Sequence, residues 1–165
     1  MLVPRRILDK LIREVARAEQ QAIEHAAREV RRLGEVPPVL ALREIGVHAL
    51  ELRPRLEYVV VGHDLSWPRR TPRSLHKSLV IDAERAFRGA LLDLRHGVAL
   101  VERLCELSKL TELFGIHRWC GDWLSARRTL VARTAAHLAW YVEGVDDPRL
   151  SSAAPHDPDP SRDST

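Results

Sequence analysis

Apolar residues recur at steps of three and four along most of this chain, which is the period of one helix face. The clearest run extends from Pro72 to Ser108. Thr71 is suited to cap its start, and Pro72 takes the first helical position, where a missing N–H costs nothing. A helix of this length is not stable alone, so the pattern predicts partner helices of similar length. The apolar positions of the run are Leu79, Ala83, Phe87, Ala90, Leu91, Leu94, Val98, Val101, Leu104 and Cys105.

Three more segments show the helical period. Residues 4–33 form the first, and Gly34 follows as the expected C-terminal cap. Residues 38–53 form the second, which should end there because Pro54 disfavours helix in the residue before it. The last covers residues 112–143 and is followed by Gly144.

Residues 54–71 break the helical pattern. They contain the β-branched run 59–61 between a proline and a glycine, and no partner strand is apparent elsewhere. The stretch is long for a bundle turn, so it predicts an extended crossover packed on the helices. The fold class is therefore all-α, a four-helix up-down bundle with one long crossover between the second and third helices. Residues 1–145 form the bundle domain. Residues 146–165 are rich in Asp, Pro and Ser and predict a disordered acidic tail.

Composition narrows the classes of function. The formal charge is +3 and the tail carries five Asp against two Arg, a balance of −3, so the remainder is +6. That basic excess is modest and interleaved with acids, which makes nucleic acid an unexpected partner. From the charged start of the first helical segment we expect no signal peptide, and the sequence has no apolar span of about 18 residues. Two cysteines, Cys105 and Cys120, give no disulfide framework. We expect a cytoplasmic protein with free thiols and no membrane contact.

The layout of two helical hairpins joined by one crossover, together with the segment 42–53, resembles the ferritin-like superfamily. The resemblance implies a di-iron site built from a Glu on each of two helices and Glu-x-x-His on each of the others. Here Glu19 matches the first glutamate, while His48 and Glu51 carry the motif in reverse order, and Asp93 and His96 stand where a single Glu is expected.

The last helix offers no central acid paired with His137, so the complete di-iron site is not expected. Two interpretations of the remaining set stay open. The resemblance implies a single divalent metal ion bound by a subset of Glu19, His48, Glu51, Asp93 and His96. Alternatively no cofactor is bound, Glu19 reaches water from the edge of the apolar stripe, and His48 and Glu51 belong to a solvated stripe.

The crossover holds the second group of candidates. This segment carries positive charges and an aromatic side chain, and the next predicted helix starts directly after it. Arginines near a helix N-terminus suit a phosphate or carboxylate ligand. Alternatively the tryptophan anchors the crossover and the arginines are solvated. The residues concerned are His63, Asp64, Trp67, Arg69 and Arg70.

Trp119, Trp123 and Trp140 cannot all share one inward stripe of the last helix at 100° per residue. We therefore expect Trp140 to anchor a two-fold homodimer interface. The chain contains no Gly-rich phosphate loop and no nucleophile motif. The sequence favours a non-enzymatic interaction or scaffold module that self-associates. The alternative is a ferritin-like metal- or small-ligand-binding protein.

Overall fold

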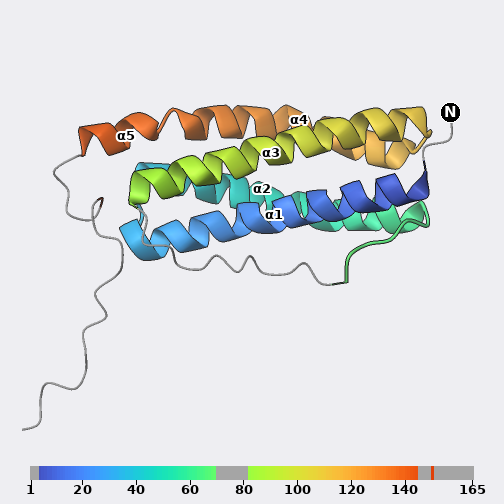
Figure 1. The fold of residues 1–165 in the computed structure, drawn as a ribbon, viewed down its shortest axis with the longest axis horizontal. Helices are drawn as coiled ribbons and strands as arrows, with labels where there is room; N and C mark the ends of the chain where they lie inside the picture. Colours follow the sequence, from blue (N-terminus) through green and yellow to red (C-terminus); the bar gives the residue numbers. More distant parts are fainter. Residues whose placement is uncertain (1–3, 70–81, 145–149, 151–165) are drawn as a thin grey trace, which may run out of the picture.

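The computed structural model describes residues 4–69, 82–144 and 150. Within these residues every regular element is a helix, and four long helices lie alongside one another (Figure 1). The all-α bundle predicted from the sequence is therefore confirmed. The elements are α1 (Arg5–Leu33), α2 (Pro37–Gly62), α3 (Ala83–Leu110), α4 (Phe114–Ala135) and the short α5 (Leu138–Glu143).

Contacts between the helices define their order. α1 packs against α2 and α3, and α4 packs against the same two helices, so α1 and α4 are diagonal across the bundle. The α2–α3 connection joins opposite ends of the bundle. His63 at the end of α2 lies beside Gly115 at the start of α4, whereas Phe87 near the start of α3 contacts Tyr141 of α5, with ring centroids 5.1 Å apart.

Helix α2 passes through Pro54 and continues to Gly62, so the predicted end at Arg53 and the predicted extended segment from residue 54 are wrong. Two features account for the continuation. Leu56 and Val60 beyond the proline are fully buried in the core. The indole N–H of Trp119 donates to the Leu52 carbonyl at 2.9 Å, which ties α2 to α4 just before the proline.

Two other helix boundaries differ from the prediction. α3 does not begin at Pro72 but after Asp82, which has extended dihedrals and accepts a hydrogen bond from the Arg85 N–H at 2.7 Å. Asp82 therefore has both the extended backbone and the side-chain hydrogen bond of an N-cap residue, so α3 starts at Ala83. Residues 70–81, including the expected cap Thr71, lie outside the described residues. The predicted helix 112–143 is divided between α4 and α5 by a turn at residues 136–137.

The bundle core consists of two apolar halves. One half holds residues such as Leu42, Phe87 and Leu91, together with Tyr141 of α5. The other holds the start of α1, the end of α2 and the aromatic first half of α4. Leu150 is also buried, at 8% exposure, and joins the first half, although it falls in the predicted tail. Residues 145–149 and 151–165 of that region lie outside the described residues. No helix in the described ranges is long and apolar enough to cross a membrane.

Glycines bring α1 close to both of its neighbours. A Cβ at Gly46 of α2 would lie 3.6 Å from the Ala22 carbonyl oxygen, and one at Gly97 of α3 would lie 3.5 Å from the Ala18 Cβ. Gly34 has φ 73° and ends α1, as predicted. Gly89, by contrast, has open space around it.

Gly89→Ala should stabilise the bundle by about 1 kcal/mol, because alanine is the better helix former and nothing opposes its methyl group. Gly34→Ala should destabilise it by about 1–3 kcal/mol, because an L side chain is strained at positive φ. Urea unfolding of both variants measures the difference. If both substitutions changed the free energy of unfolding equally and in the same direction, the backbone conformations assigned to Gly34 and Gly89 would be contradicted.

Candidate functional site

A buried ion pair divides the two halves of the core. Glu19 of α1 and Arg127 of α4 are 1% and 2% exposed, and they come from diagonally placed helices. Arg127 binds the carboxylate with both terminal nitrogens, Nη1 to Oε1 at 3.0 Å and Nη2 to Oε2 at 3.1 Å. This fork geometry is the strongest arrangement available to an arginine and a carboxylate. The expectation that Glu19 reaches water is wrong.

Two further side chains surround the Arg127 guanidinium. Its Nε donates to His48 Nδ1 of α2 at 3.1 Å, and its central carbon lies 4.4 Å from the centre of the Trp123 ring. A cation over an indole face is favourable when both are removed from water. The guanidinium is therefore held by a carboxylate, an imidazole and an aromatic ring from three helices.

Burial shifts the pKa values of Glu19, Arg127 and His48. Loss of solvent raises the pKa of Glu19, and the charge of Arg127 offsets only part of that effect. The same burial lowers the pKa of Arg127. Burial and the neighbouring guanidinium lower the pKa of His48 to about 4. His48 is therefore neutral at pH 7, as it must be to accept a hydrogen bond from Arg127.

The predicted metal ligands lie in separate places. Glu19 and His48 meet, but a protein cation already lies between them. Glu51 and His96 are exposed, and Asp93 pairs with His25 of α1 at 3.2 Å. In the described part of the chain, no three His, Cys, Asp or Glu side chains form a group able to hold a metal ion.

Sequence reasoning missed Arg127, the central residue of the polar layer. A signal was present, because Arg127 follows Trp123 by four residues and precedes Val131 by four, which places it on the buried stripe of α4. It also missed the buried Glu29 of α1, whose pKa is raised by loss of solvent. Burial also raises the pKa of Tyr141, and the negative charge of Glu29 is the next largest cause of that rise.

The crossover candidates do not converge on one ligand position. His63 packs towards Gly115 of α4, whereas the Asp64 carboxylate lies 3.8 Å from Arg5 of α1. Trp67 is half-buried beside Arg6, Asp9 and Arg13, in a small hollow of about 250 Å³.

In that hollow Asp9 accepts a hydrogen bond from the Ser66 N–H at 3.2 Å. The anion beside Trp67 is therefore the chain's own carboxylate. Arg69 is exposed, and Arg70 lies outside the described residues. Within residues 63–69 the arrangement matches an anchored crossover better than a phosphate site.

The outward face of α2 is unusually apolar for a surface. Its exposed side chains follow the helix from end to end, opposite the face that fills the core. Their exposures are Leu40 41%, Val47 47%, Leu50 58%, Tyr58 82% and Val61 58%. We call these five residues the α2 stripe. Isolated exposed apolar residues are ordinary, but a continuous row along one helix marks an interaction surface.

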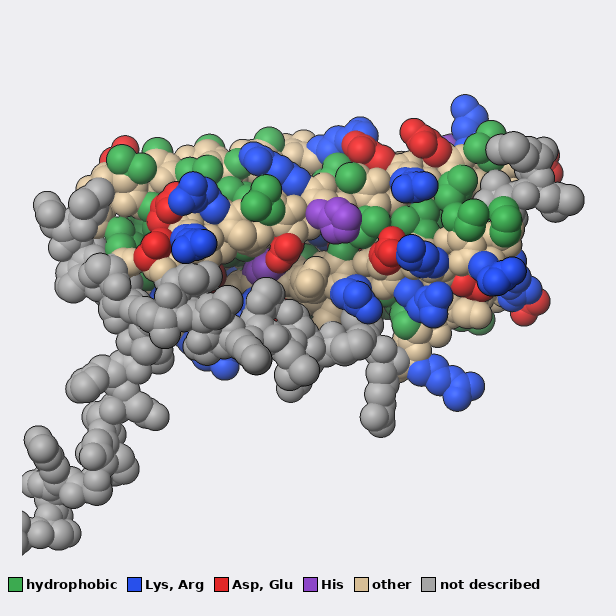
Figure 2. Space-filling view, in the orientation of Figure 1, with side chains coloured by type: hydrophobic (Ala, Val, Ile, Leu, Met, Phe, Trp, Pro, Cys, Tyr) green, Lys and Arg blue, Asp and Glu red, His purple; other side chains and the backbone are tan. Residues whose placement is uncertain are grey.

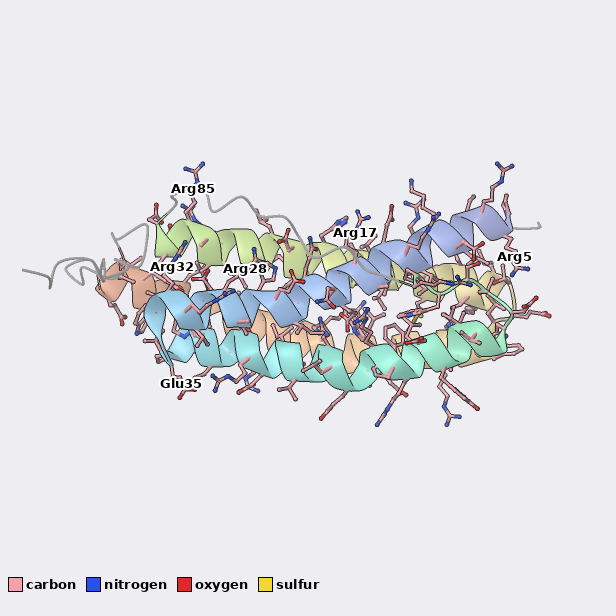
Figure 3. All side chains as sticks on the ribbon, turned by 90° about the horizontal axis from the view of Figure 1, so that it is seen from below. Arg5, Arg17, Arg28, Arg32, Glu35 and Arg85 are labelled. Atoms are coloured by element: carbon pink, nitrogen blue, oxygen red, sulfur yellow. The ribbon has the colours of Figure 1, made fainter. Side chains whose placement is uncertain are left out.

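A groove of about 970 Å³ between α1 and α2 borders the α2 stripe. Val47 and Leu50 form one wall with Arg43, and Ile23 and Arg28 lie on the α1 side. Figure 3 looks onto these two helices, with Glu35 at the turn between them and Arg5 at the far end. On the side seen in Figure 2, formed by α1 and α3, basic and acidic side chains alternate with apolar ones.

The remaining aromatic and thiol candidates are mostly internal. Trp119 and Trp123 are buried, and Trp140 is half-buried with its ring edge-on to Tyr141 at 5.0 Å. An interface role for Trp140 stays a prediction. Cys105 and Cys120 are free thiols, and burial raises the pKa of Cys120, which makes it unreactive.

Comparison with known proteins adds no relative: no protein-family model, no curated protein and no solved structure matches this chain. Over residues 4–69, 82–144 and 150, the structure defines a four-helix bundle with a buried ion pair at its centre and an exposed apolar face on α2.

Glu19→Leu and Arg127→Met should each destabilise the protein by about 3–5 kcal/mol, because each leaves a buried charge without its partner. Replacing both, as Glu19→Leu with Arg127→Met, should recover most of that loss. Urea unfolding measures the cycle. Arg128→Ala is the matched control, since its 2.7 Å pair with Glu102 is exposed and should be worth less than about 1 kcal/mol. Strictly additive losses in the double variant would contradict the account.

His48 makes stability depend on pH in a defined direction. Its folded pKa of about 4 lies below the unfolded value of about 6.5. The unfolded chain therefore takes up a proton that the folded chain does not, and stability from this group is lost as pH falls from about 6.5 to 4. His48→Gln keeps an acceptor for Arg127 and should lose less stability between pH 7 and 4.5. Parallel stability curves for the two proteins would rule out this role of His48.

Proposed function

We propose that this protein is a non-enzymatic interaction module that self-associates through the α2 stripe. The observation that carries the proposal is the continuous row of exposed apolar side chains on α2, beside the groove against α1. A helix face of this kind removes its apolar surface from water by receiving another helix.

The internal polar groups favour a structural role over catalysis. Glu19, Arg127 and His48 bind one another at the centre of the core, where a substrate would have to displace a bidentate ion pair. The free and unreactive Cys120 thiol supports a reducing cytoplasmic location, which we include in the proposal. The ferritin-like relationship is also a proposal; it rests on the bundle layout and the crossover between opposite ends.

Light scattering at micromolar concentration tests the proposal. Wild-type protein should have about twice the chain mass of 18.8 kDa. Val47→Glu combined with Leu50→Glu should be monomeric and still helical, because both side chains are exposed and their burial occurs only on association. Leu92→Glu on α3 is the matched control, since Leu92 is 64% exposed and lies away from the stripe.

A monomeric wild type would reject self-association. A dimer that survives the paired change at Val47 and Leu50 would reject the α2 stripe as its interface. Loss of the dimer in the Leu92→Glu control would move the interface to α3.

A further inference from the structure

We propose that the occupant of the α2 stripe is α2 of a second copy, in antiparallel orientation and centred near Leu50. This inference rests on the self-association proposed above and specifies its geometry. It follows from the spacing of the apolar side chains and from the placement of the charges that border them.

The α2 stripe has the spacing of a helix–helix seam. Of its members, Leu40, Val47 and Val61 are separated by multiples of seven residues, and Leu50 stands three residues after Val47. The exposed Pro54, which lies between the two halves of the stripe, falls in the same heptad series. Alternating steps of three and four along an exposed face are the pattern by which two helices pack side chains into each other. Because the row extends over most of α2, its natural partner is a straight helix of similar length.

Two charges on the α1 side of the stripe are symmetric about Leu50. Arg43 stands seven residues before it and Glu57 seven residues after it, so both lie along the same line of the helix. A two-fold axis at Leu50 between antiparallel copies places Arg43 opposite Glu57 of the other copy, twice. Because Leu50 lies at the middle of α2, the same axis sets the positive N-terminal end of each copy beside the negative C-terminal end of the other, whereas a parallel pair sets like ends together.

The α4 side of the stripe shows the same arrangement. Glu44 stands six residues before Leu50 and Arg55 five residues after it. The antiparallel pair therefore brings Glu44 opposite Arg55, again twice by symmetry. Four attractive side-chain contacts and the opposed helix ends favour the antiparallel dimer. A parallel two-fold pair would place the α1 side of one copy against the α4 side of the other, so reversing both Arg43 and Glu57 would there put like charges opposite Glu44 and Arg55 instead of restoring attraction.

The existing partners of these charges do not prevent the pairing. Arg43 binds Glu35 at 2.7 Å and Glu44 lies 3.4 Å from Arg133, and all four side chains are exposed. Exposed ion pairs contribute little, so these side chains can reorient or share their charge with a second copy at small cost.

Charge reversal in the full chain tests the pairing. Arg43→Glu and Glu57→Arg, made singly, should each weaken the dimer about tenfold, because each creates two like-charge contacts. The double variant carries both changes in every chain and should return to within about threefold of wild type. Arg95→Glu, an exposed change on α3, controls for net charge. The dissociation constants come from sedimentation equilibrium.

Cross-linking then tests the orientation, in a Cys105→Ser background with a short bis-maleimide. Leu40→Cys and Val61→Cys should each fail to cross-link alone, because in the antiparallel dimer each lies about 30 Å from its own copy. A mixture of the two should cross-link. Self-cross-linking of either variant, or no rescue by the double charge reversal, would overturn the antiparallel geometry while leaving the α2 interface in place. A monomeric wild type would overturn the proposed function and this inference together.

Discussion

The ion pair between Glu19 and Arg127 is the constraint on which the rest of this bundle depends. It connects α1 and α4, which lie diagonally across the bundle, at the boundary between the two apolar halves of the core. Two charges removed from water are stable only with near-ideal geometry and extra hydrogen bonds. The fork to the carboxylate, the bond to His48 and the stacking on Trp123 meet that demand in one register of α1, α2 and α4.

The ion pair also determines what remains available for function. Because Arg127 holds Glu19 and His48, these groups serve the bundle's own packing. The inward side of α2 is occupied by the same arrangement, through His48 and through the Leu52 carbonyl that receives the Trp119 indole. Among the described residues, the outer side of α2 carries a row of apolar side chains that the other helices do not cover. We therefore place the function of the protein on that surface.

Much of the fold was predictable because it depends on local pattern. The helical period, the Gly34 cap and the need for a crossover follow from side-chain spacing and backbone preference. The errors arose where tertiary contacts prevail. Pro54 does not end α2, because the buried Leu56 and Val60 and the bond from Trp119 outweigh a missing backbone donor. Glu19 was expected at a boundary because its partner stands 108 residues later, and only the fold brings the two together.

The α2 stripe escaped sequence reasoning for a related reason. With apolar residues on two sides, α2 shows no contrast between an inner and an outer face, and the pattern alone does not say which side is the core. Hydroxyl-radical footprinting of the wild-type chain, from nanomolar to tens of micromolar, tests the account most directly. Val47, Leu50 and Tyr58 should become protected as concentration rises, while Leu92 and Phe114, whose exposures of 64% and 70% fall within the range of these three residues, stay reactive. Unchanged labelling of α2, or protection at Leu92 and Phe114 instead, would contradict the account.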